Sequence, residues 1–230
     1  MSQYNTHVEM IRVVAQHLGQ DLLQQTAFVG GCTTGLHLTD SVTKEDIRYT
    51  EDVDLIIHII GYTGWHNFQT MISERGFKLA TDEDIMCRFK LGNLIVDFMP
   101  DDESVLSFSN RWYKDALETA IDYPIDDSIT IRLVAPCYFV ATKFEAYKGR
   151  GKGDLLASRD MEDILNVVNG REELLGECQQ ASDDVKHYLG QAFSELLENP
   201  DIDYAVQATA HGDGGREAII FERLEQLAEI

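Results

Sequence analysis

The pattern of apolar and polar positions divides the chain into a mixed first half and a helical second half. Apolar residues at helical spacing over 7–18 predict a helix that Gly19 ends. Gly92-Asn93 predicts a tight hairpin turn between two strands. Short apolar and β-branched runs predict strands at 27–29, 52–60, 86–91, 94–99 and 129–134, with a second helix over 65–75.

From Pro136 onward the pattern is helical. Pro136 suits the first turn of a helix running through Tyr147, which the glycines at 149 and 151 are expected to end. Ser158 is the expected N-cap of the next helix. Further helices are expected near 171–180, 183–197 and 215–230. The sequence therefore predicts an α+β protein, with an α/β domain at 1–135 and a C-terminal helical domain at 136–230.

Composition narrows the class of protein. The 230 residues are 44% hydrophobic and 26% charged, which is typical of a folded globular chain. No apolar run is long enough to cross a bilayer, and the first residues lack the pattern of a signal peptide. The four cysteines are scattered, without the spacing of a zinc site or a disulfide framework, so they are expected to be reduced thiols. We therefore expect a cytoplasmic protein with no membrane partner.

The net charge of −21 disfavours general binding to nucleic acids, because such a surface repels phosphate backbones. One stretch departs from this balance. KFEAYKGRGK, residues 143–152, holds four basic residues against one acid. It is either a local basic patch that accepts a phosphate-bearing ligand or an ordinary solvated face.

A pair of acids begins the predicted strand at 52–60. Side chains alternate along a strand, so Asp52 and Asp54 project from the same face, about 6–7 Å apart. Two carboxylates at that spacing repel each other unless a cation lies between them. Since oxygen ligands favour magnesium or manganese, the pair is a candidate site for Mg²⁺ or Mn²⁺.

Asp97 is a third candidate ligand. It lies inside the apolar run LIVDFM, where burial of a carboxylate is costly without a partner. One possible partner is Arg88, on the other strand of the hairpin. The other is a metal ion shared with Asp52 and Asp54. The sequence leaves both open.

Upstream of the acids, FVGGCTTGL has the pattern of a strand, a glycine turn and a helix start, with Thr33 and Thr34 at the opening of the helix. Gly30 and Gly31 allow a phosphate to approach the backbone, and the N–H groups of a helix start bind anions. A plain tight turn is the alternative. Together with the acids, the turn predicts an anion site facing a metal site.

The segments VGGCTTGL and RYTEDVDLII resemble the signature of the DNA polymerase beta-like nucleotidyltransferase superfamily. ATKFEAYKGRGKGDLLASRDMEDI is similar to the AbiEii-type branch, which includes toxins of toxin–antitoxin and phage-defence systems. The resemblance covers about Phe28 to Arg171. It implies a mixed β-sheet flanked by helices, and a helical domain that completes the active-site cleft.

The resemblance also implies roles for single residues. Gly30 and Gly31 match the phosphate-binding turn, Asp52 and Asp54 the pair that binds two divalent ions, and Asp97 the carboxylate that helps to activate the attacking hydroxyl. One departure is Cys32, which stands where the family usually has Ser or Thr, so Thr33 or Thr34 would have to supply a hydroxyl. A second is the longer spacing between the glycines and the acid pair.

Further matches lie outside the metal pair. Lys143 matches the helical lysine that contacts the triphosphate, with Arg150 in support. Asp160, or else Asp163, matches the acid of the final motif. Arg48, with Thr50, matches the R-x-T that precedes the acid pair.

The predicted function is transfer of a nucleoside monophosphate group from a nucleoside triphosphate such as ATP to an acceptor hydroxyl. The acceptor is left open among a tRNA end, a protein side chain and a small molecule. A toxin role, with an antitoxin protein as partner, is what the AbiEii-type branch implies. The alternatives are a glycosyltransferase that uses the D-x-D pair and an inactive binding protein with the same fold.

Overall fold

The computed structural model describes residues 2–81, 85–106, 109–150 and 153–230, and the chain forms two compact units. The first comprises residues 1–33 and 48–135, and the second comprises 34–47 and 136–230. The second junction lies between residues 135 and 136, and the segment 34–47 groups with the helical unit.

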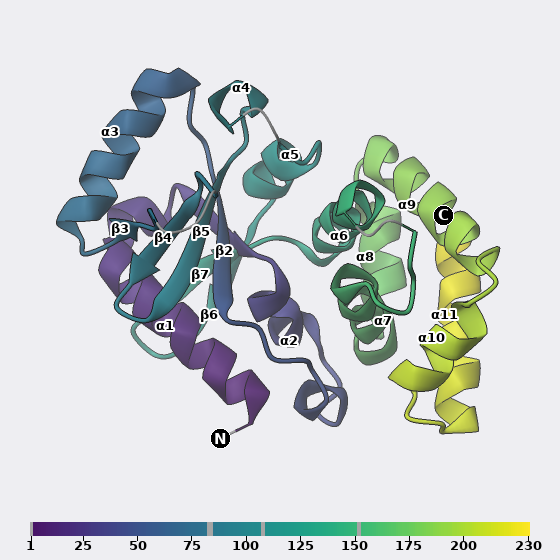
Figure 1. Ribbon diagram of the computed structural model, residues 1–230. Helices are drawn as coiled ribbons and strands as arrows, with labels where there is room; N and C mark the ends of the chain where they lie inside the picture. The colour runs from purple at the N-terminus through teal and green to yellow at the C-terminus, as the bar shows by residue number, and fades with distance from the viewer. Residues whose placement is uncertain (1, 82–84, 107–108, 151–152) are drawn as a thin grey trace. The chain divides into compact units, whose positions relative to one another are not determined.

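The first unit is built on a mixed sheet with the described strand order β3-β4-β5-β2-β1-β7-β6 (Figure 1). Its strands are β1 (Thr26–Val29), β2 (Asp52–Ile57), β3 (Lys78–Leu79), β4 (Arg88–Leu91), β5 (Leu94–Pro100), β6 (Ile121–Pro124) and β7 (Thr130–Leu133). The pairs β2–β5 and β1–β7 are parallel, and the other neighbouring pairs are antiparallel. The α+β class predicted from the sequence, a mixed sheet followed by a helical part, is confirmed.

Four described α-helices accompany this sheet: α1 (Gln3–Leu23), α3 (Gly61–Glu74), α4 (Glu103–Leu106) and α5 (Tyr113–Glu118). Gly19 breaks the helical geometry of α1, as predicted, because its φ of +71° is non-helical. A short second helical segment then continues to Leu23.

The alternation of β5 separates an apolar face of the sheet from a polar one. Phe98 packs edge-on against Phe68 of α3, with ring centroids 5.1 Å apart, and against Phe77 at 5.4 Å and Phe89 at 5.6 Å. Since neighbouring side chains in a strand point to opposite faces, Asp97 projects away from this aromatic core. The core therefore fixes the direction of the acid.

The second unit is helical in its described part. It contains α2 (Thr34–His37), α6 (Pro136–Arg150), α7 (Arg159–Gly170), α8 (Leu174–Gln180), α9 (Asp183–Leu197), α10 (Ile202–Thr209) and α11 (Gly214–Ala228). Ser158 caps α7 as predicted, by accepting a hydrogen bond from the Met161 N–H. The helix α6 ends at Arg150, one residue beyond the first of the two glycines expected to break it, and Gly151 lies outside the described residues.

The segment 34–47 joins this unit through α7. The N–H groups of Thr39 and Asp40 both donate to the Gly170 carbonyl, at 2.8 and 2.9 Å. A Cβ on Gly170 would lie 2.9 Å from Leu38 Cδ2 and 3.0 Å from Thr43 Cβ, so a side chain there would require the neighbouring side chains to shift. Asp40 also pairs with Arg216 of α11.

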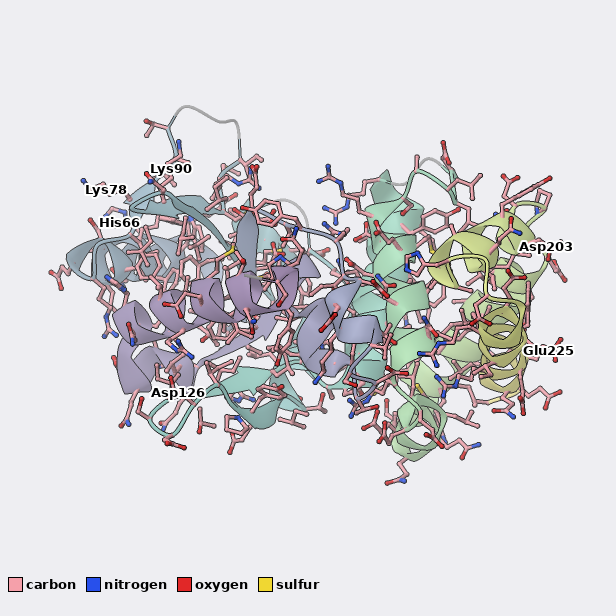
Figure 2. The ribbon with its side chains drawn as sticks, turned by 90° about the horizontal axis from the view of Figure 1, so that it is seen from below. His66, Lys78, Lys90, Asp126, Asp203 and Glu225 are labelled. Atoms are coloured by element: carbon pink, nitrogen blue, oxygen red, sulfur yellow. The ribbon has the colours of Figure 1, made fainter. Side chains whose placement is uncertain are left out.

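Asp203 and Glu225 are exposed acids of the second unit, and Figure 2 shows them projecting from α10 and α11. None of the described helices has the length and apolar character that crossing a membrane requires.

Candidate active site

Three carboxylates from two parallel strands form the candidate site. The register of β2 and β5 sets Asp54 directly opposite Asp97, and Asp52 opposite Ile95. Asp52, Asp54 and Asp97 each offer an oxygen, and these oxygens lie within 4.8 Å of one another. Asp97 is buried, whereas the other two acids are half-buried. The structure thus brings together the acids that the sequence marked as metal ligands.

Asp97 also forms an ion pair with Arg88, the other partner that the sequence left open. Arg88 of β4 lies opposite Asp97 in the antiparallel hairpin. Its Nε donates to Asp97 Oδ1 at 2.9 Å and its Nη2 donates to Oδ2 at 2.7 Å. The same Nη2 lies 3.7 Å from Asp52 Oδ2. An ionised carboxylate has about four lone-pair positions, so this pair leaves Asp97 able to accept a further ligand.

The glycine turn lies directly against the acids. Gly30 has φ +79°, and a Cβ on it would collide with the carboxylate of Asp54. A Cβ on Gly31 would meet the guanidinium of Arg48. Position 30 requires glycine for two reasons. The backbone is left-handed there, and the carboxylate of Asp54 occupies the space that a side chain at position 30 would need. The turn, the acid pair and Arg48 are therefore one site.

The side chains of Cys32 and Thr33, which follow the glycine turn, both contact backbone carbonyl groups. Thr33 donates to the Gly30 carbonyl from both its N–H, at 3.1 Å, and its hydroxyl, at 2.9 Å. The Cys32 thiol points instead to the His7 carbonyl, at 3.8 Å, and burial raises its pKa well above the usual range. Thr34 is buried, and its hydroxyl has no hydrogen-bond partner among the described residues. That Thr33 or Thr34 supplies a hydroxyl to a phosphate stays a prediction.

A buried histidine contacts Thr50, the residue that bonds to Asp52, and no motif in the sequence indicated it. The Thr50 N–H donates to His7 Nε2 of α1 at 3.2 Å, and the Thr50 hydroxyl donates to Asp52 Oδ1. Because Nε2 accepts this bond, the ring proton of neutral His7 lies on Nδ1. The R-x-T pattern marked Thr50, but no motif near His7 linked this helix residue to Thr50, which lies 43 positions further along the chain.

The Thr50 contact makes a first prediction. Thr50→Val removes the hydroxyl that orients Asp52 and is expected to weaken Mn²⁺ binding about tenfold, since partners that orient metal ligands contribute 10–100-fold. Mn²⁺ titration followed by electron paramagnetic resonance measures this. Thr130→Val makes the same replacement at an exposed position of β7 and should bind Mn²⁺ like the wild type. Equal affinities for the two variants would contradict the role of Thr50.

The glycine turn makes a second prediction, with a matched control. Gly30 and Gly92 both have positive φ, but a Cβ on Gly92 would meet no described atom within 4 Å. Gly92→Ala should therefore cost only the strain of the backbone, about 1–2 kcal/mol. Gly30→Ala adds the collision with Asp54 and should also weaken Mn²⁺ binding at least about tenfold. Urea unfolding and Mn²⁺ titration check the pair; a Gly30→Ala protein with wild-type Mn²⁺ affinity would refute the assigned contact.

The second unit holds the lysine-bearing helix. Lys143 of α6 is only 5% exposed, and its Nζ donates to Asp163 Oδ2 at 2.6 Å and to Asp160 Oδ1 at 3.3 Å. Arg150 donates to both oxygens of Asp160 at 3.0 Å. Lys143 is thus not a solvated surface lysine, which was the alternative to its functional role. The roles of Lys143, Arg150, Asp160 and Asp163 at a triphosphate stay predictions.

The stretch 143–152 carries less uncompensated charge than its composition indicates. Lys143 and Arg150 pair with acids of α7, and Lys148 lies 3.4 Å from Glu195 and over the ring of Tyr188. The last base, Lys152, lies outside the described residues. The described bases are therefore balanced within the unit.

No family model matches the chain, and no curated protein matches it. Among solved structures, the chain is similar to the solution structure of the antibiotic-resistance factor ANT(2'')-Ia. The two share 11% sequence identity, and the match has a TM-score of 0.48 and covers 90% of this chain and 98% of that chain. At this identity and TM-score we draw no activity from the likeness.

Proposed function

We propose that this chain is a metal-dependent nucleotidyltransferase, which transfers a nucleoside monophosphate group from a nucleoside triphosphate to an acceptor hydroxyl. The observation that carries the proposal is the convergence of Asp52, Asp54 and Asp97 within 4.8 Å, beside a glycine turn. An acid cluster adjoining an anion-binding turn is the arrangement that a metal–triphosphate complex requires.

The donor set fits a divalent cation of the magnesium type. The three side chains offer only carboxylate oxygens, which Mg²⁺ and Mn²⁺ prefer. The carboxylate of Asp54 can occupy its position because Gly30 lacks a side chain. When bound, such ions neutralise charge on the phosphates and lower the pKa of the attacking hydroxyl.

The protein's own groups bind and orient the reactants. Backbone N–H groups at the glycine turn can donate hydrogen bonds to the phosphates. The guanidinium of Arg48 can donate charge-assisted hydrogen bonds to them as well. Asp97 is proposed to accept a hydrogen bond from the acceptor hydroxyl and so to orient it. As Asp97 takes the proton of the hydroxyl, the hydroxyl oxygen forms a bond to the α-phosphorus, the bond from that phosphorus to the oxygen bridging to the β-phosphate breaks, and pyrophosphate leaves.

Two alternatives make different demands on the site. A glycosyltransferase needs the D-x-D pair but neither the glycine turn against Asp54 nor a third acid on the next strand. An inactive binding protein needs no intact ligand set, yet all three acids are present and adjacent. Both observations favour the nucleotidyltransferase.

The test uses two labels. Purified protein is incubated with Mg²⁺ or Mn²⁺, a cell extract, and each nucleoside triphosphate labelled at either the α- or the γ-phosphate. Label from the α-position should appear in RNA, protein or a small metabolite, and Asp97→Ala should abolish transfer while largely keeping nucleotide binding. Transfer from the γ-position would identify a kinase instead. An Asp97→Ala protein as active as the wild type would reject the proposed site.

The acceptor and the biological role are the finer parts of the proposal. The net charge of −21 and the paired bases of 143–150 favour a small molecule or a protein side chain over a tRNA end. A toxin role rests on the resemblance of the second half to the AbiEii-type branch. Induced expression of wild type and Asp54→Asn tests it, because only the active protein should arrest growth.

A further inference from the structure

Arg88 is the cation that the strand register places against the acid cluster. Its side chain is 17% exposed, it donates to both oxygens of Asp97, and its Nη2 lies 3.7 Å from Asp52. One guanidinium therefore contacts acids from two different strands of the candidate site, while belonging to a third strand, β4.

This position gives Arg88 effects of different size on two states of the protein. Without a metal ion, three carboxylates with oxygens within 4.8 Å repel one another, and a guanidinium among them offsets part of that repulsion. With a divalent ion, the ion already offsets most of that repulsion, and the guanidinium lies near a second positive charge. The charge of Arg88 therefore stabilises the metal-free state more than the metal-bound state.

We propose that Arg88 is a built-in counter-ion of the acid cluster, which stabilises the metal-free protein and lowers its affinity for divalent cations. The inference rests on the proposed function for the identity of the ion. Arg88 leaves lone pairs of Asp97 open, so the ion and the guanidinium can share this carboxylate. The effect of Arg88 on affinity is then one of charge, and the bidentate fork adds the orientation of Asp97.

The chain supplies a matched control on the same strand. Lys90 follows Arg88 at the next position on the same face of β4, but it lies opposite Ile95 and not opposite an acid. On its other side it pairs with Lys78 at the sheet edge, and Figure 2 shows these two lysines beside each other. Lys90→Gln removes the same charge from the same strand without touching the cluster.

The experiment compares wild type, Arg88→Gln, Arg88→Lys and Lys90→Gln. Mn²⁺ affinity is measured by electron paramagnetic resonance of the free ion, and thermal unfolding is followed with a chelator and with Mn²⁺. Arg88→Gln should bind Mn²⁺ about tenfold more tightly. Its midpoint in chelator should fall by roughly 2–4 °C, and its rise with Mn²⁺ should exceed that of the wild type.

The controls separate charge from shape. Arg88→Lys keeps the charge but loses the bidentate fork, so its Mn²⁺ affinity should lie nearer to that of the wild type than to that of Arg88→Gln. If Arg88→Gln fails to fold, binding by Arg88→Lys that is about tenfold tighter than that of the wild type would contradict the role of the charge. Lys90→Gln should match the wild type in both measurements. Weaker or unchanged Mn²⁺ binding by Arg88→Gln, where the wild type binds, would overturn the inference alone. Absence of Mn²⁺ binding in every variant would overturn the proposed function with it.

Discussion

Asp54→Asn is expected to lower the rate of α-label transfer about a thousandfold, which corresponds to about 4 kcal/mol of transition-state stabilisation. Asp54 lies opposite Asp97 in the parallel register and against the glycine turn, so it belongs to both halves of the site. Asparagine keeps the shape of the side chain but loses the charge that holds a divalent ion. The loss should appear in the turnover measured by the label-transfer assay.

Glu51→Gln is the matched control for this variant. Glu51 is exposed, precedes the acid pair directly, and carries the same charge, so its replacement should leave transfer within about twofold, as for other surface changes. Thermal unfolding in chelator should show no loss of stability for Asp54→Asn, because the remaining acids repel each other less. If both variants retained wild-type turnover, the acid pair would have no catalytic role.

Lys143→Met is expected to lower the free energy of unfolding by about 3–5 kcal/mol, the usual cost of removing one partner of a buried ion pair. Lys143 is buried between Asp160 and Asp163, and the variant leaves both acids in place without its ammonium. Lys148→Met, in the same helix, removes a half-exposed lysine and should cost less than about 1 kcal/mol. Urea unfolding followed by circular dichroism compares the two, and equal losses would contradict a structural role for Lys143.

The same network predicts a dependence on pH. Burial raises the pKa of Asp160, but hydrogen bonds and charge from Arg150 and Lys143 outweigh it, so the pKa lies below the usual 3.8. A lowered pKa in the folded state contributes stability above pH 3.8 that is lost as the pH falls through the folded-state value. The stability difference between Lys143→Met and the wild type should therefore shrink on acidification below that pH.

Elements with strong periodicity were predictable from the sequence, whereas several short ones were not. The helix at 183–197 and the hairpin around Gly92-Asn93 occur where the pattern placed them. The edge strands β3 and β6 escaped prediction because most of their residues are exposed and show no alternation. The eight-residue α10 also escaped prediction.

The candidate site was predictable only where its residues lie close together in the sequence. Alternation within β2 places Asp52 and Asp54 on one face, and the glycines precede them in sequence. The meeting of Asp97 with that pair depends on strand order, which no local pattern encodes and which the family resemblance supplied. The two candidate partners of Asp97 looked exclusive in the sequence, yet β5 lies between β4 and β2, so Arg88 and Asp54 approach it from opposite sides.

The central claim is that acids of two strands bind a divalent cation together, and Mn²⁺ titration of wild type, Glu51→Gln, Asp54→Asn and Asp97→Asn tests it most directly. Wild type and Glu51→Gln should deplete the signal of free Mn²⁺ equally, whereas Asp54→Asn and Asp97→Asn should each bind at least about tenfold more weakly. An Asp97→Asn protein that takes up Mn²⁺ along the same curve as the wild type would contradict the claim.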